Sequence, residues 1–466
     1  MALIVLWAGA CAAFLAVLRP RLAPFLLSPV VWVSGSMLAL ALAGAWFYQG
    51  VAMAPGGAGI RLIISDALVV QTAHLLLLAT TAFLCGAALA VARRRPAPRP
   101  VDSFRAITLG STTMAALAAG CALPLAYTMV IPGLPYLLDR PFYLQSNYGG
   151  GLAAIAGQLS VAAVLGCGFL TTVWRGPGRA VPIALFGLYL LMFFGGATRV
   201  LALAPTLFAL GAFVGAPSRR TRVWLVIGAA LSIYLVRLPL FLRSQAEHGL
   251  FPYARRLPAY LVDISGWDVV ALNLLISFGI IGVTAYVQPH FPFQDLMVSL
   301  NPLPGRLAGW YEIADVHRLN VYTPYATVGE LANVSKFAVI GYFAVLGVLM
   351  AHLDGRVQSH LRSGRQGPAL LIVGLVALFC LYNQQYNLRQ STRMVYYAIA
   401  LDLALWAWFW FRARQDLSRD GGQVLPGAPP ALVPGDGPAA WMPSPTSHGS
   451  RPRVRDGGSG RTSGPT

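Results

Sequence analysis

The chain has 466 residues, of which 57% are hydrophobic and only 11% are charged. Soluble globular proteins carry about 25% charged residues, so this composition excludes that class. Repeated apolar runs of about 20 residues are each long enough to cross roughly 30 Å of hydrocarbon. Because these runs do not alternate apolar with polar residues, they favour helices over the strands of a membrane barrel. The sequence therefore predicts an all-α, polytopic membrane protein.

The net charge is +18, and every lysine or arginine except Lys336 is an arginine. In a soluble domain such an excess would suggest a nucleic-acid partner. Arginines that retain short loops in the cytoplasm explain the excess here, so we expect no nucleic acid. The five cysteines lie scattered inside apolar runs, which indicates neither a disulfide framework nor a metal site. The cysteines are Cys11, Cys85, Cys121, Cys167 and Cys380.

Hydropathy predicts about eleven transmembrane helices, with boundaries accurate to a few residues. The first run has no basic leader and no clear cleavage site, so we interpret it as a retained span. The predicted spans are 2–18, 30–48, 68–92, 107–126, 151–173, 180–197, 200–216, 223–241, 337–353, 368–383 and 394–411.

Arginines follow every odd-numbered span and so predict the orientation of the chain. Cytoplasmic loops are enriched in arginine and lysine, which places the N-terminus outside and the C-terminus in the cytoplasm. The arginines that set this pattern lie at 19 and 21, 93–105, 175 and 179, 219–222, 356–365, and 412 and 414.

One outward loop, 242–336, is far longer than ordinary connections and is therefore expected to be functional. It contains an apolar stretch, 269–287, that could be a twelfth span. An extra crossing would break the arginine pattern, so we favour an interfacial or re-entrant helix. The membrane domain is expected over 1–414, and the Gly-, Pro- and Ser-rich segment 415–466 is expected to be a disordered cytoplasmic tail.

Soluble-enzyme motifs are absent from the sequence, and the first outward loop holds only one acidic residue, Asp66. What remains is a set of outward arginines. Arg199 follows the sixth span directly, against the topological bias, and either snorkels to lipid phosphates or contacts an anionic group. Arg237 and Arg243 lie near the outer end of the eighth span and precede Glu247 and His248, which lie within a few turns of them if that helix continues. Further candidates are Arg255, Arg256, Arg306, His317 and Arg318.

Three segments resemble the Wzy-type oligosaccharide repeat-unit polymerases, the O-antigen polymerase family. They are Ser299–Gly305 with its two prolines, Tyr322–Leu331 with the pattern P-Y-x-x-x-G-E, and the glycine-containing span Ile340–Leu349. The Gly-Gly-Ala-Thr-Arg turn that ends at Arg199 is similar to the family too. The plan of about eleven spans and one large late extracytoplasmic loop fits over residues 1 to about 412, which implies a GT-C-like fold. O-antigen ligases are similar in plan.

The resemblance implies glycosyl transfer at the outer face of a bacterial inner membrane, from a polyprenyl-diphosphate-linked oligosaccharide to a sugar hydroxyl of another lipid-linked unit. It implies no metal and no cofactor, and it makes a chain-length regulator a candidate partner. Guanidinium groups suit a diphosphate, so Arg199, Arg237 and Arg243 are the expected contacts. The expected substrate-binding residues are Arg255, Arg256, Arg306, Arg318 and Glu330, and His317 is expected to close over the sugars. The base is expected among Glu247, His248, Glu312, Asp315 and His317.

Three alternatives stay open at this point. A ligase of the same plan would pass the glycan to a different acceptor. A glycolipid flippase or transporter would form no new bond, although the sequence shows no internal repeat of the kind common in transporters. A metal-dependent sugar transferase is disfavoured because the acidic pair expected in the first outward loop is missing.

Overall fold

The computed structural model describes most of the chain between residues 1 and 419. The described residues are 1–24, 27–51, 65–92, 94, 110–131, 133–140, 150–216, 218–243, 245–262, 267–303, 305–317, 326–363 and 366–419. The described residues between Met1 and Ala407 form one compact unit. Within the described ranges the structure is helical, apart from one isolated β-bridge.

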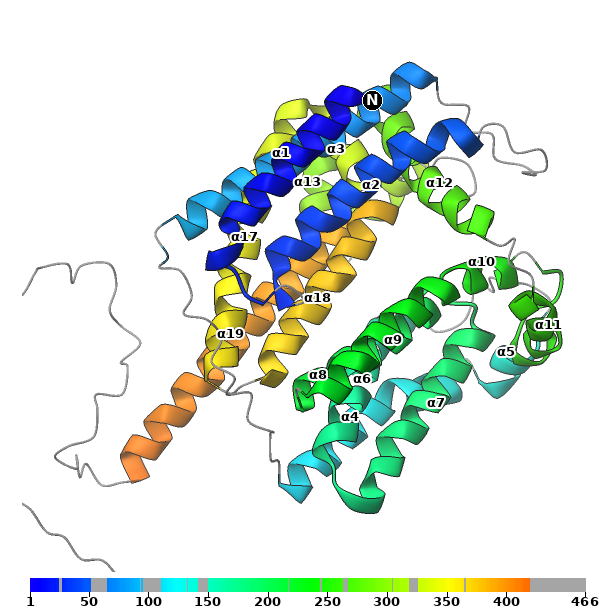
Figure 1. Ribbon diagram of the computed structural model, residues 1–466, viewed down its shortest axis with the longest axis vertical. Coiled ribbons are helices and arrows are strands. Elements are labelled where there is room, and N and C mark those ends of the chain that lie inside the picture. Colours follow the sequence, from blue (N-terminus) through cyan, green and yellow to red (C-terminus); the bar gives the residue numbers. More distant parts are fainter. Residues whose placement is uncertain are drawn as a thin grey trace, which may run out of the picture. The chain divides into compact units, whose positions relative to one another are not determined.

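The helices follow one another along the chain, with connections of very different lengths (Figure 1). They are α1 (Ala2–Leu18), α2 (Pro29–Val51), α3 (Asp66–Val91), α4 (Ser111–Val130), α5 (Leu134–Leu138), α6 (Gly150–Val173), α7 (Ala180–Gly195), α8 (Val200–Gly215), α9 (Arg219–Leu235), α10 (Arg237–Arg243), α11 (Leu250–Val262), α12 (Trp267–Tyr286), α13 (Phe293–Leu300), α14 (Gly305–Ala308), α15 (Trp310–Val316), α16 (Thr327–Val334), α17 (Lys336–Arg362), α18 (Gln366–Gln385) and α19 (Leu388–Arg419).

Ten of the eleven segments predicted as spans each overlap one helix, and segment 223–241 covers parts of α9 and α10; the helices confirm an all-α membrane protein. Among the described residues, seven helical segments are long and apolar enough to cross a bilayer: Ala2–Arg21, Pro29–Trp46, Asp66–Val91, Ser111–Val130, Gly176–Gly195, Arg219–Arg243 and Lys336–Arg362. Shorter apolar helices lie within α6, α8, α12 and α18. The length and hydropathy of these helices make the chain a multi-pass membrane protein.

Three details differ from the sequence prediction. The fourth helix begins at Ser111 rather than at residue 107. The helix of the eighth span does not continue toward His248, because α9 ends at Leu235 and the short α10 ends at Arg243. The last helix runs to Arg419, so residues 415–419 are helical and not part of a disordered tail. The rest of the predicted tail, 420–466, lies outside the described residues.

The spans pack as two groups, one of α1, α2, α3, α17 and α18 and the other of α4, α6, α7, α8 and α9 (Figure 1). Glycines allow the closest approaches. A Cβ on Gly168 of α6 would lie 1.9 Å from the Phe208 carbonyl oxygen of α8, and one on Gly86 of α3 would lie 1.9 Å from the Ala344 oxygen of α17. Helices in a membrane associate through such small residues, since lipid provides no hydrophobic force between them.

Helix α12 packs against one end of the first group. A Cβ on Gly44 of α2 would collide with the Phe278 ring, and Gly282 contacts Thr72 of α3. The Tyr286 hydroxyl donates to the Gln71 carbonyl at 3.5 Å. These contacts lie near the C-terminal end of α2 and the N-terminal end of α3. Both of these ends are predicted to face outward. Helix α16 joins the same region, since Gly329 lies against Ile281 and Thr284 of α12.

Candidate functional site

The turn between α7 and α8 is a constrained backbone segment, and Arg199 follows it. Ala197 adopts a φ of 46°, in the left-handed region that few residues other than glycine occupy. The Thr198 N–H donates to the Phe193 carbonyl at 3.0 Å, which closes the end of α7. The Cβ of the buried Ala197 crowds the following carbonyl oxygen in this conformation, which costs about 1–2 kcal/mol, so the surrounding contacts must hold the turn.

Two arginines from distant segments hold this turn. The Arg140 Nη1 donates to the Gly195 carbonyl at 3.0 Å, and the Arg243 Nε donates to the Ala197 carbonyl at 2.9 Å. Carbonyls at a helix C-terminus have no partner within the helix, and cations there also oppose the negative end of the helix dipole. Arg140 and Arg243 therefore stabilise the end of α7 as well as concentrating positive charge there.

The segment after α10 pairs with the segment after α5. Arg140 and His248 exchange backbone hydrogen bonds of 2.8 and 3.1 Å in an antiparallel bridge. Gly249 follows with a φ of +119°, and a Cβ on it would lie 2.6 Å from the Leu138 carbonyl oxygen, so only glycine fits this close approach. The bridge places Glu247 beside Asp139 and Arg140, although they lie far apart in the sequence.

His248 is buried beneath this bridge. Its Nδ1 hydrogen-bonds the hydroxyl of Tyr253, which is fully buried, at 2.7 Å. Burial, and then the positive charge of Arg140, lower the pKa of His248 below its ordinary value. The imidazole is therefore neutral at neutral pH. It anchors the start of α11 to the segment that carries Glu247.

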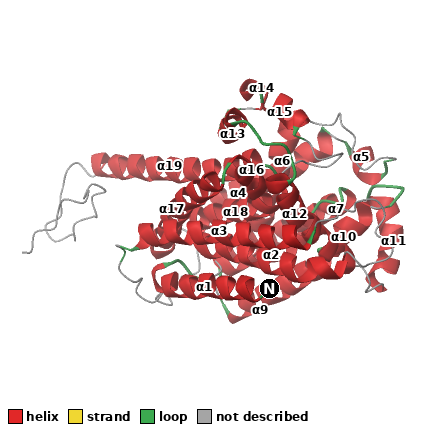
Figure 2. Cartoon of the chain, turned by 90° about the horizontal axis from the view of Figure 1, so that it is seen from above, coloured by secondary structure: helices red, strands yellow, loops and turns green. Residues whose placement is uncertain are grey.

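A hollow of about 640 Å³ opens beside the bridge. Two cationic and two acidic side chains line it, together with an aromatic ring and a proline; the lining residues are Asp139, Arg140, Glu247, Phe251, Pro252 and Arg255. They come from the segment after α5, the segment after α10 and the first turns of α11. Helices α5 and α11 both contact α7, and α10 and α11 lie at one end of the molecule in Figure 2.

The structure brings Glu247 and Arg255, two of the predicted site residues, to the wall of this hollow. His248 lies behind the wall, and Arg256 is exposed but outside the lining. Arg237 is 1% exposed, with its guanidinium carbon 4.4 Å from the centre of the Tyr234 ring.

Arg199 is half-buried at the start of α8, and Arg243 is engaged with the turn. These three predicted diphosphate contacts, Arg199, Arg237 and Arg243, do not line the hollow.

Sequence reasoning missed Arg140, Asp139 and Phe251. A signal for Arg140 was present, because it is an outward arginine under the same charge rule that singled out Arg199. No sequence signal distinguished Asp139 or Phe251 from other loop residues. Their role depends on the bridge between residues 140 and 248, which is a tertiary contact.

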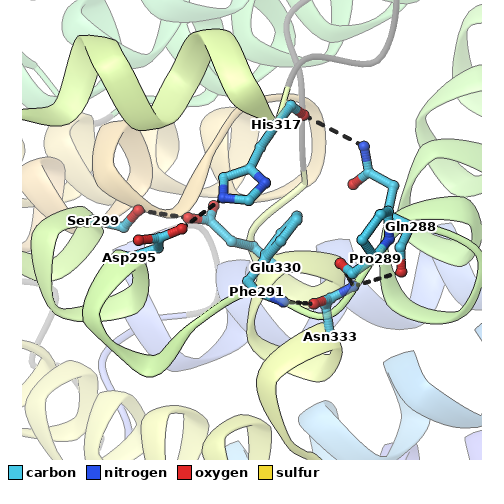
Figure 3. A network of polar contacts seen from close by, with 8 residues as sticks. All are labelled: Gln288, Pro289, Phe291, Asp295, Ser299, His317, Glu330 and Asn333. Carbon is cyan, nitrogen blue, oxygen red and sulfur yellow. Dashed lines mark hydrogen bonds and ion pairs between the residues drawn. The ribbon is translucent and has the colours of Figure 1, made fainter.

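A second polar cluster ties together the long loop (Figure 3). The His317 Nε2 lies 2.6 Å from the Asp295 Oδ2, and the Gln288 side-chain amide donates to the His317 carbonyl at 3.3 Å. The Ser299 hydroxyl donates to the Glu330 carboxylate at 2.6 Å. The Asn333 amide donates to backbone carbonyls between Thr284 and Pro289 and accepts from the Phe291 N–H. This cluster fixes α13 and α16 to each other.

Glu330 is 4% exposed, and protein groups bond both of its oxygens, the second receiving the Leu388 N–H at 2.9 Å. Burial raises the pKa of Glu330 to about 7, against the opposing effect of these hydrogen bonds. Arg389 donates to the carbonyls of Val298 and Leu303. Here the predicted substrate-binding Glu330 links α13, α16 and the start of α19.

The remaining predicted residues of this loop are described only in part. Arg306 lies on α14 and Asp315 on α15, and nothing can be said of their side chains. Arg318 lies outside the described residues. Glu312 is exposed on α15. Among the described residues, no group of three or more His, Cys, Asp or Glu side chains gathers as metal ligands would.

Comparisons of the chain with protein-family models, with curated proteins and with solved structures found no match.

Proposed function

We propose that this protein polymerises polyprenyl-diphosphate-linked oligosaccharide repeat units at the outer face of a bacterial inner membrane, as the resemblance to Wzy-type polymerases implies. The hollow at the start of α11 carries the proposal, because it combines arginines with carboxylates at the end of membrane helices that is predicted to face outward. A diphosphate leaving group requires cations, and an acceptor hydroxyl requires a base. A GT-C-like plan and a topology of eleven spans belong to the same proposal.

The reaction assigns a task to each kind of side chain. The bond between the anomeric carbon of the donor sugar and its diphosphate oxygen breaks, and the acceptor oxygen forms the new bond to that carbon. Arg255 stabilises the negative charge that develops on the departing diphosphate, and the buried Arg140 holds the end of α7 beside the hollow. Glu247 takes the proton of the acceptor hydroxyl, since it is the predicted base that lines the hollow. His248 and Tyr253 position the segment that carries it.

The decisive test uses purified protein in nanodiscs with a polyprenyl-diphosphate-linked repeat unit, and without nucleotide sugar or added metal. We expect products spaced by one repeat unit when they are resolved by mass. A single transfer to another supplied acceptor would instead indicate a ligase. Absence of any new glycosidic bond would contradict the proposal and favour a transporter.

Variants then test the assignment of residues. We expect Glu247→Gln to lower the rate by roughly 10²-fold or more, because the amide cannot accept the proton.

Arg255→Ala should lower the rate by roughly 10²-fold, which is typical of losing one electrostatic contact to a leaving group. Arg256→Ala should have a smaller effect, since Arg256 does not line the hollow. Arg220→Ala, an exposed arginine at the start of α9, serves as the matched control and should leave the rate unchanged. Equal losses at Arg255 and Arg220 would contradict the assignment.

A further inference from the structure

The ring of Phe251 is 55% exposed and lines a hollow whose other members are mainly polar. Many apolar side chains of this protein are exposed, but the Phe251 ring differs from them in lining a hollow beside charged groups, where an aromatic ring offers a flat apolar face. The first turns of α11 lie against α5 and α7, across the end of α7 (Figures 1 and 2). The ring thus belongs to the wall of the hollow and not to the sides of the membrane helices.

Arg255 follows Phe251 by four residues on the same helix. Residues at this spacing are neighbours on one face, with Cβ atoms about 5–6 Å apart. Both side chains line the hollow, so α11 presents a flat apolar surface and a guanidinium group side by side. A sugar ring joined through its anomeric oxygen to a phosphate presents the complementary pair of features, an apolar face next to an anionic group.

We propose that Phe251 and Arg255 together form a binding site for the glycosyl diphosphate group, in which the pyranose C–H face stacks on the Phe251 ring and Arg255 binds the adjacent phosphate. The site deepens the proposed function and rests on it for the identity of the substrate. Asp139 and Glu247 lie in the same hollow, where their carboxylates accept hydrogen bonds from sugar hydroxyls. Phe251 is thereby the residue that distinguishes a sugar-bearing diphosphate from a bare one.

The test compares two probes in detergent solution: a geranyl-diphosphate-linked hexose and geranyl diphosphate alone. For the unaltered protein we expect the sugar-bearing probe to bind more tightly. Phe251→Ala should lower the affinity for the sugar-bearing probe by roughly fivefold to tenfold and leave the affinity for bare geranyl diphosphate unchanged. Phe251→Trp should retain the preference, and Arg255→Ala should weaken both probes by similar factors.

Phe293→Ala, another exposed phenylalanine on α13, is the matched control and should change neither affinity. An affinity ratio that does not respond to Phe251→Ala would overturn the inference, as would equal binding of both probes to the unaltered protein. The polymerisation assay is independent of these measurements. If the protein forms the product ladder but the affinity ratio of the two probes does not depend on Phe251, only this inference fails. If the affinity ratio depends on Phe251 but no product ladder forms, the proposed reaction fails and the binding site remains supported.

Discussion

The arginines that are predicted to face outward differ in role according to what their guanidinium groups touch. Arg140 and Arg243 donate to carbonyls at the end of α7, and Arg389 donates to one carbonyl in α13 and one just after it. Arg255 is exposed on the wall of the hollow. The sequence does not distinguish these arginines, because the distribution of charge along the loops predicts only the side of the membrane on which each arginine lies. Burial and hydrogen-bond partners separate structural arginines from those that face a ligand.

The buried carboxyl group of Glu330 predicts how the stability of the protein depends on pH. Burial raises its pKa from an ordinary value of 4.5 to about 7, and nearby Asp295 adds to this. A raised pKa in the folded state means that its contribution to stability is fully present below pH 4.5 and is lost as pH rises through 7. The shift corresponds to about 3 kcal/mol. We expect the melting temperature of the protein in detergent to fall between pH 5 and pH 8, and Glu330→Gln to remove most of that fall.

Glutamine suits this test because its amide donates to the Ser299 hydroxyl and its carbonyl accepts the Leu388 N–H. The control is Glu312→Gln, an exposed glutamate on α15, which should leave the pH dependence unchanged. If Glu330→Gln melts with the same pH profile as the unaltered protein, Glu330 does not titrate in this range.

At the scale of elements, helix ends and glycine contacts determine how the spans pack. Ser218 caps α9 through a reciprocal capping box with Thr221, and Ser65 accepts the Leu68 N–H at the start of α3. Such caps satisfy N–H groups in the first turn that have no partner within the helix. Between α6 and α8, Gly168 and Gly211 bring the backbones into direct contact.

Alanine at Gly168 should destabilise the protein, since its Cβ would lie 1.9 Å from the Phe208 oxygen and force the two helices apart. Overpacking of this kind costs about 1–3 kcal/mol. The expected readout is a lower melting temperature and a smaller monodisperse fraction in size-exclusion chromatography. Gly157→Ala is the matched control on α6, because nothing lies within 4 Å of the new Cβ there. Equal behaviour of the two variants would refute this view of the interface.

At the scale of the whole molecule, the open question is whether α12 crosses the membrane. Its contacts with Gly44, Gln71 and Thr72 all lie near the same ends of α2 and α3. They involve Phe278, Gly282 and Tyr286, which belong to the part of α12 whose side chains are described. These contacts favour the expectation of a helix that stays in the outer part of the membrane.

Cysteine labelling tests this topology in a variant that lacks the native cysteines. If α12 does not cross, an impermeant maleimide added from outside should label both Ala246→Cys and Glu312→Cys, which are exposed positions on either side of α12. Ser363→Cys, between α17 and α18, should react only after the membrane is permeabilised. Labelling of positions 246 and 312 from opposite faces would mean that α12 spans and that the proposed orientation is wrong for one half of the chain.

The sequence by itself determined the helices, because apolar runs in lipid must satisfy their backbone hydrogen bonds internally and this requirement is local. It also singled out Glu247 and Arg255, since an acidic or basic side chain in an outward loop is visible without any contact. Only the tertiary structure decided which of the outward residues meet. Asp139 and Arg140 reach Glu247 through a backbone bridge between distant segments, and Phe251 joins them because α11 packs across the end of α7. Hydropathy and charge depend on each residue alone, whereas a binding site depends on which surfaces pack together, and one sequence does not state that packing.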